Sequence, residues 1–159
     1  MVIKVNYKIL IVLLVVIFLL ASVCVYTAVN ATEQGIKVPI IMYHSILNTR
    51  TGTYIVSPEQ LEKDLKYISE KGYTTITMTD LINYVYDDGK LPKKPIILTF
   101  DDGYYNNYTY LLPLLEKYDM KAVISIVGDF TDNFSGTNEV NTNYSYFRWV
   151  DINMLIPER

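Results

Sequence analysis

Two adjacent aspartates follow an apolar run in the stretch "IILTFDDG", residues 96–103, and they are the clearest candidates for chemistry in this sequence. Asp101 and Asp102 carry like charges side by side. These charges repel each other, so the arrangement does not stabilise the protein unless a positive group lies near both. A dication keeps both carboxylates ionised, whereas in a bare pair one carboxyl tends to hold its proton. Because successive residues leaving a strand point to different sides, one aspartate can bind a metal while the other takes a proton from water.

The tripeptide Asp-Asp-Gly is also a common turn signal, and the sequence contains a second example. Residues 86–90 read "YDDGK" and follow a predicted helix, where the motif indicates a plain turn. The pair at 101–102 instead follows a predicted buried strand, 96–100. In parallel α/β folds the chemistry lies at the carboxyl ends of the strands. The position of this pair therefore predicts a functional site, and Gly103 allows the chain to turn sharply there.

Alternating strands and helices must position this pair. Strands are predicted where β-branched and apolar residues cluster, at 38–46, 73–78, 96–100 and 121–127. Helices are predicted at 57–72, 79–88, 104–119 and 146–156, with loops or turns at 47–56, 89–95 and 128–145. This order predicts an α/β fold with a parallel sheet and right-handed crossovers, either open or closed into a barrel.

Several residues mark where the predicted helices begin and end. Ser57 is a candidate cap with Pro58 in the first turn of its helix. Thr79 or Asp80 is expected to cap the second helix. Pro113 predicts a break or restart in the third helix, and Pro157 is expected to stop the last one.

An apolar segment near the amino terminus stands apart from these elements. Residues 9–29 carry no charge and are long enough to cross a bilayer as a helix. Lys4 and Lys8 precede the segment, and no further Lys or Arg occurs before Lys37. The positive-inside tendency predicts a cytoplasmic amino terminus and an exported, membrane-anchored remainder. The alternative is a signal peptide cleaved after Ala31, which would give a secreted protein.

The single cysteine and the charge narrow the classes of protein. Cys24 is the only cysteine and lies in the apolar segment, so we expect no disulfide and no cysteine metal site in the exported part. Attachment of a lipid to Cys24 is a third possibility for the segment, beside an anchor and a cleaved signal peptide. Leaving out Lys4 and Lys8 takes the formal charge from −3 to −5, and no basic patch indicates nucleic-acid binding. We expect an anchor or signal segment at 1–31, a linker at 32–37 and one domain at 38–159.

The stretch "ILTFDDGY", residues 97–104, resembles the first motif of the NodB-like polysaccharide deacetylases. These are metal-dependent carbohydrate esterases that remove N-acetyl groups from chitin-like polymers or peptidoglycan. "VPIIMYHSI" resembles the opening strand of that family, and "SPEQLEKDLKYISEKGYTTITMTDL" resembles its next helix and strand. "NNYTYLLPLLEKYDMKAVISIVGDF" and "RWVDINML" resemble the later segments, so the resemblance covers nearly all of residues 38–155 in order.

The resemblance implies a role for each matching residue. Asp101 would be the general base and Asp102 a ligand of a divalent metal, for which zinc is the family expectation. His44 and Tyr104 are expected to line the pocket, and a structural histidine is the alternative reading of His44. The implied fold is a distorted (β/α) barrel, here incomplete, and the implied partner is an extracellular polysaccharide: peptidoglycan, a chitin-like chain or poly-N-acetylglucosamine.

The sequence departs from the family at the metal site. The family supplies two histidine ligands in a His-Ser/Thr-x-x-His motif, whereas His44 is the only histidine in this chain. Because one carboxylate does not replace two imidazoles, we expect a truncated deacetylase that is inactive alone. A neighbouring reading frame would then supply the other half.

Two other hypotheses remain open at the level of the sequence. One is a non-catalytic glycan-binding remnant whose stacking surface is formed by Tyr104, Tyr105, Tyr108 and Trp149. The other is a small membrane-anchored interaction protein that has inherited an idle domain.

Overall fold

The computed structural model describes residues 7–32, 35–137 and 140–155, with no side-chain description for residues 28–34. The chain divides into two units, Met1–Ile36 and Lys37–Arg159. Three sequence predictions depend on positions outside this description. They concern the Lys4 charge, the Ala31 side chain at the predicted cleavage site and the Pro157 helix stop. The functional assignment of the predicted anchor, linker and domain stays a prediction.

The described part of the first unit contains the helix α1 (Tyr7–Thr32). Its side chains are apolar on every side over residues 9–25 apart from Ser22, so the helix has no polar face to turn towards water. The stretch Tyr7–Thr27 is long and apolar enough to cross a membrane, by length and composition only. A signal sequence near an amino terminus would meet the same criterion, so the helix is compatible with both a membrane anchor and a cleaved signal peptide.

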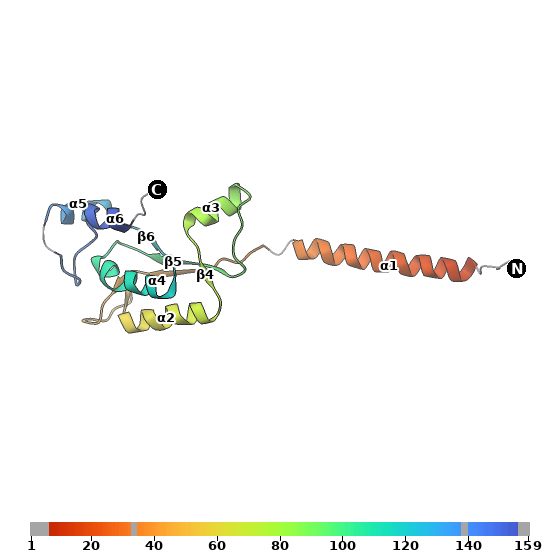
Figure 1. Cartoon of the computed structure of the whole chain (residues 1–159), viewed down its shortest axis with the longest axis horizontal. Coiled ribbons are helices and arrows are strands. Elements are labelled where there is room, and N and C mark those ends of the chain that lie inside the picture. The colour runs from red at the N-terminus through yellow and green to blue at the C-terminus, as the bar shows by residue number, and fades with distance from the viewer. Residues whose placement is uncertain (1–6, 33–34, 138–139, 156–159) are drawn as a thin grey trace. The chain divides into compact units, whose positions relative to one another are not determined.

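The second unit is built on a parallel sheet whose central strand is β5 (Pro95–Phe100) (Figure 1). β1 (Ile40–Tyr43) pairs with one edge of β5, from Ile40 opposite Ile97 to Tyr43 opposite Phe100. On the other edge, β4 (Thr74–Thr75) pairs with the start of β5 and β6 (Val123–Ile124) pairs with its end. The described strands form an open sheet, in agreement with the predicted incomplete barrel.

A second, two-stranded parallel sheet follows β1 directly. β2 (Ser45–Ile46) pairs with β3 (Ile55–Val56), so the predicted strand 38–46 is divided at His44 and the predicted loop 47–56 ends in a strand. The division matters for the site because it places His44 at the junction of the two sheets.

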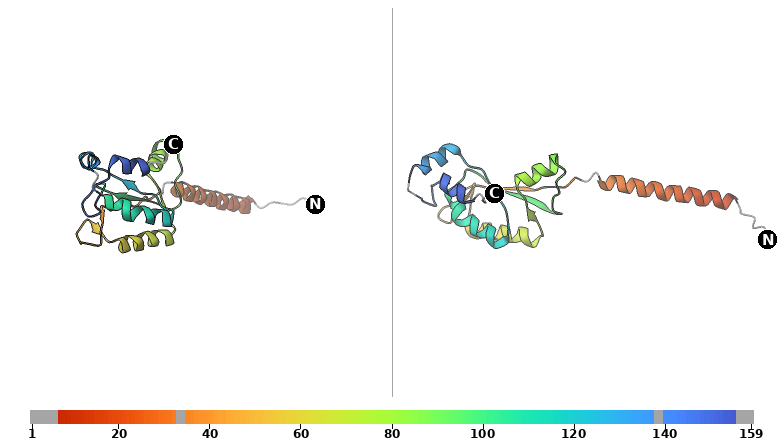
Figure 2. Two further views of the ribbon diagram at one scale, coloured as in Figure 1. Left: turned by 60° about the vertical axis from the view of Figure 1, so that its left-hand side comes forward. Right: turned by 45° about the horizontal axis from the view of Figure 1, so that its top comes forward.

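The core lies between the sheet and the helices α2 (Pro58–Glu70) and α4 (Leu112–Tyr118). These two helices lie along one face of the sheet, and α3 (Met78–Tyr86) lies on the opposite side in every view (Figures 1 and 2). β5 is buried on both faces, which explains why it reads as an unbroken apolar run. The buried side chains of this core cluster are Ile46, Leu61, Leu65, Ile68, Ile96, Leu98, Phe100 and Leu111.

The caps of α2 and α3 show one confirmed and one wrong prediction. Ser57 caps α2, since its hydroxyl accepts a hydrogen bond from the amide of Gln60 at 3.1 Å. α3 is capped by Thr77 and not by Thr79 or Asp80. The Asp80 carboxylate accepts from the Thr77 amide at 2.8 Å, which completes a capping box. Thr77 therefore belongs to the helix start, and the predicted strand 73–78 shortens to β4.

The carboxyl-terminal half of the unit also differs in part from the prediction. The predicted helix 104–119 is a π-helical turn at Asn107–Leu111 followed by α4, with Pro113 in the first turn of α4 where no amide is required. The predicted loop 128–145 contains a helix, α5 (Gly128–Ser135). Its Phe130 ring packs against Tyr146 at 4.5 Å, so tertiary contact stabilises a segment of polar composition.

The last helix, α6 (Trp149–Leu155), begins three residues later than predicted because Asp151 fixes its start. The buried Asp151 carboxylate accepts hydrogen bonds from the Arg148 amide at 2.9 Å and from the guanidinium at 2.8 and 2.9 Å. These contacts hold Arg148 in a structural role at the helix start.

Candidate functional site

The two aspartates follow β5 directly and lie at the carboxyl end of the sheet. The Asp101 amide donates to the Tyr43 carbonyl at 2.9 Å, which extends the β1–β5 ladder by one residue. Both aspartates are partly exposed, so each carboxylate can reach solvent or a substrate. The ladder therefore fixes the backbone of the pair while leaving its side chains accessible.

The chain turns at once after Asp101 through two residues in the left-handed region. Asp102 has φ of 70° and Gly103 has φ of 67°. Aspartate is among the few residues that tolerate this conformation, whereas glycine adopts it freely. Gly103 is also tightly enclosed, because an added Cβ would lie 3.1 Å from Ile126 Cγ2 and 3.2 Å from Ile126 Cα. The turn thus depends on this glycine for both conformation and space.

The second Asp-Asp-Gly has a similar backbone but a different setting. Asp88 has φ of 54°, and Asp87 is the cap residue that ends α3. Both aspartates there are exposed and follow a helix, as predicted for a plain turn. What distinguishes the pair at 101–102 is its attachment to a buried parallel strand.

A pair of tyrosines lies next to the turn. Tyr104 and Tyr146 form an isolated antiparallel bridge, and their rings stack at 4.8 Å between centroids. The Phe147 amide donates to the Gly103 carbonyl at 2.8 Å, which holds residues 146–147 against the turn. The pKa of Tyr146 is raised to about 12 by burial, by its hydrogen bond with Tyr104 and by the negative charges of its neighbours, Asp102 among them.

We expect the raised pKa of Tyr146 to make the fold sensitive to alkali. Because the folded pKa exceeds the value near 10 of an unfolded chain, the stabilisation is complete below pH 10 and is lost as pH rises from about 10 to about 12. Tyr146→Phe has no proton to lose, so its melting temperature should fall less than that of the parent between pH 9 and pH 11.5. Equal losses in thermal unfolding would contradict this linkage.

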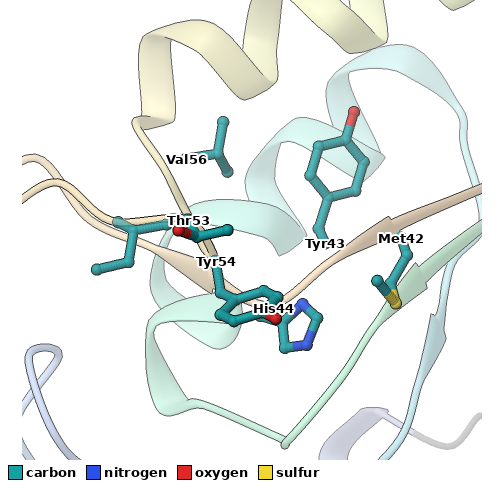
Figure 3. A pocket seen from close by; sticks show the side chains of 7 residues that line it. Met42, Tyr43, His44, Thr53, Tyr54 and Val56 are labelled. Atoms are coloured by element: carbon teal, nitrogen blue, oxygen red, sulfur yellow. The ribbon is translucent and has the colours of Figure 1, made fainter.

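His44 is the first residue after β1, as Asp101 is the first residue after β5. It directly follows Tyr43, the last β1 residue in register with β5, and Tyr43 and His44 leave the ribbon on opposite sides (Figure 3). His44 lines a pocket of about 200 Å³ formed by residues 42–44 and 53–56. Its ring lies against Tyr54, with 4.7 Å between centroids and a tilt of 41°. Nothing in the sequence pattern had singled out Tyr54.

The structure brings some of the predicted site residues together and separates others. The Asp101 amide bonds to the carbonyl of Tyr43, the residue before His44, and the turn after Asp102 leads to Tyr104, which is bridged to Tyr146. The aromatic residues of the proposed stacking surface do not form one exposed platform. Tyr105 and Tyr108 stack at 5.5 Å and pack against the buried Phe147 ring, while the Trp149 indole donates to Asp132 at 2.7 Å.

The donor atoms at the strand end do not complete a metal site. Within residues 7–32, 35–137 and 140–155 no group of three or more His, Cys, Asp or Glu side chains could hold an ion. A catalytic zinc takes three protein ligands and leaves one position open. Asp101 and Asp102 therefore supply at most part of a ligand set, and the residues present do not by themselves fit a catalytic zinc.

Comparison with known proteins shows which proteins these features resemble. The family model described as polysaccharide deacetylase matches residues 88–146, which include the acid pair and its turn. The protein named "Putative polysaccharide deacetylase YxkH" of Bacillus subtilis is 38% identical over 97 residues, which are 61% of this chain and 34% of that protein. The poly-beta-1,6-N-acetyl-D-glucosamine N-deacetylase of Escherichia coli K12 is 35% identical over 78 residues, 48% of this chain and 12% of that protein.

A solved structure extends the likeness to the fold. Streptococcus pyogenes deacetylase PplD, in complex with acetate, superposes with a TM-score of 0.63 at 24% identity, over 75% of this chain and 51% of that one. The chain thus spans about a third of the Bacillus relative and half of the solved deacetylase.

Proposed function

We propose that this chain is a member of the polysaccharide deacetylase family and supplies the acid pair of a site that hydrolyses N-acetyl groups on an amino-sugar polysaccharide. The observation that carries the proposal is the attachment of Asp101 and Asp102 to the carboxyl end of β5, with the Asp101 amide bonded to β1. The position is the one at which parallel α/β folds place their chemistry.

The two carboxylates would have different roles. Asp101 would act as the general base and take a proton from a water molecule as its oxygen attacks the acetamide carbonyl. Collapse of the tetrahedral intermediate breaks the carbon–nitrogen bond, and the amine takes up the proton that Asp101 received, so that acetate and the free amino sugar leave and the Asp101 carboxylate is restored. Asp102 would be one ligand of a divalent metal, zinc by family.

The remaining metal ligands would have to come from outside the described residues, 7–32, 35–137 and 140–155. The described residues lack a group of three His, Cys, Asp or Glu side chains that could hold the ion. The chain alone is therefore expected to bind zinc weakly and to release no acetate. The incomplete set of metal ligands among the described residues also favours the second candidate function, a non-catalytic glycan-binding or interaction protein tethered to a membrane.

The substrate class and the location follow from different parts of the chain. The names of the relatives support an amino-sugar polymer, with poly-β-1,6-N-acetylglucosamine, chitin-like chains and peptidoglycan as candidates. The length and composition of α1 support export, either anchored in a membrane or cleaved after Ala31. The negative formal charge gives no support for nucleic acid as a partner.

A joined chain tests the proposed function. Residues 1–155 are fused to the segment of the Bacillus relative that follows its matched region; we call this fusion the joined chain. With zinc present, the joined chain should release acetate from at least one of three substrates: β-1,6-linked N-acetylglucosamine oligomers, chitin oligomers or peptidoglycan. Circular dichroism establishes that it is folded. A folded, zinc-loaded joined chain that releases no acetate from any of the three would contradict the proposal.

A further inference from the structure

We propose that the pocket between the end of β1 and residues 53–56 is a subsite for one pyranose ring of the amino-sugar polymer, with Tyr54 as its stacking platform. The proposal rests on the proposed function and specifies where the polymer lies beside the acid pair. It assigns a role to Tyr54, a residue outside the motif that carries the acid pair.

The backbone holds this platform in place before any ligand binds. After β2 the chain loops out and returns, and the Ser45 amide donates to the Tyr54 carbonyl at 3.1 Å. The Leu47 amide donates to the Val56 carbonyl at 3.0 Å, and the Ile55 amide donates to the Gly52 carbonyl at 3.1 Å. Tyr54 is therefore fixed between two hydrogen-bonded positions, so stacking a ligand on it costs little ordering of the loop.

The Tyr54 side chain is ordered on one side and open on the other. Its ring packs on the His44 ring at 4.7 Å, yet 64% of the residue remains exposed. A large aromatic ring that is oriented by a neighbour and still accessible offers a flat apolar surface. The axial C–H face of a pyranose is the ligand surface that matches it, and the tyrosine hydroxyl can bond to the sugar hydroxyls.

The walls of the pocket combine apolar and polar groups in the way a sugar requires. Met42, Ile55 and Val56 provide apolar contacts, while Thr53 and the His44 imidazole provide hydrogen-bonding atoms (Figure 3). The pocket volume of about 200 Å³ is below the roughly 300–1,000 Å³ of a typical small-molecule site. This size suits one sugar residue or its substituent and not a longer piece of chain.

Strand register places this pocket next to the acid pair. The carbonyl that accepts from the Asp101 amide belongs to Tyr43, and His44 is the next residue. A sugar ring on Tyr54 would thus lie beside the ring whose acetamide faces Asp101, as expected for a polymer that crosses the carboxyl end of the sheet. The subsite would hold the neighbouring residue of the chain and would contribute binding without taking part in the chemistry.

The test measures binding and needs neither metal nor turnover. The full 159-residue chain carrying Asp101→Asn and Asp102→Asn, in detergent micelles without added metal, is titrated with tetramers of β-1,6- and β-1,4-linked N-acetylglucosamine and followed by ligand-observed NMR. We expect binding of at least one tetramer, about five-fold or more weaker in Tyr54→Ala and retained in Tyr54→Phe, which keeps the ring. Tyr86→Ala, at a tyrosine that is 79% exposed on α3, should bind as the parent does.

Each outcome separates the subsite from the proposed function. Unchanged binding in Tyr54→Ala, equal weakening in Tyr86→Ala, or no binding of either tetramer by the parent at millimolar concentration would overturn the subsite. In each of these cases the joined chain can still release acetate, so the proposed function is not contradicted. Conversely, a joined chain without activity would leave Tyr54-dependent binding measurable and would favour the non-catalytic glycan-binding function.

Discussion

Replacing Asp101 with asparagine should lower acetate release by the joined chain by about two to four orders of magnitude, the usual contribution of a general base. Asparagine has nearly the same shape, and its backbone amide can keep the bond to the Tyr43 carbonyl. It cannot accept the proton from the attacking water. The loss should therefore appear in kcat with little change in melting temperature, measured by acetate assay and thermal unfolding.

The second Asp-Asp-Gly supplies the matched control for this experiment. Asp87 is the first aspartate of that tripeptide and ends a helix instead of a strand. Asp87→Asn removes the same charge from the same local sequence, and we expect the activity of the parent. If Asp101→Asn retained activity within ten-fold of the parent, or if both variants lost activity equally, the assignment of the base would be wrong.

Gly103→Ala should destabilise the fold by about 2–5 kcal/mol, because it combines two separate costs. The left-handed φ of 67° is unfavourable for alanine, and the new methyl group would crowd the backbone and side chain of Ile126 at 3.1–3.2 Å. Urea unfolding of the full chain in detergent, followed by fluorescence of the single tryptophan, measures the loss.

Gly72→Ala separates conformational strain from crowding. Gly72 has φ of 70°, nearly the same as Gly103, but nothing lies within 4 Å of an added Cβ there. Gly72→Ala should therefore lose only the free energy that the left-handed backbone conformation costs, about 1–2 kcal/mol. The difference between the two variants then reports the crowding against Ile126, and equal losses would mean that the β5 turn is less closely packed than the structure indicates.

Local sequence signals predicted the elements that are stabilised locally. The Ser57 cap, the amphipathic face of α2 and the buried run of β5 each depend on neighbouring residues, and each was predicted correctly. The acid pair could be located for the same reason, because a charged doublet after an apolar strand is visible in sequence alone. Its roles in catalysis and metal binding stay predictions.

The features that sequence reasoning missed depend on contacts between distant residues. α5 has a polar composition and is held partly by the contact between Phe130 and Tyr146. Tyr146 and Tyr54 reach the site through a bridge to Tyr104 and a loop that folds back on Ser45. No periodicity or spacing in the sequence encodes those pairings. The cap of α3 was misplaced by two or three residues because Thr77 looked like the end of a β-branched strand.

The central claim is that the carboxylate pair at the end of β5 faces a divalent cation. Zinc titration by calorimetry tests it most directly, on the folded joined chain, its Asp102→Ala variant and an Asp88→Ala control from the second Asp-Asp-Gly. We predict one zinc per joined chain, at least about a hundred-fold weaker binding in Asp102→Ala, and no change in Asp88→Ala. Zinc binding by Asp102→Ala with the affinity of the parent would contradict the account.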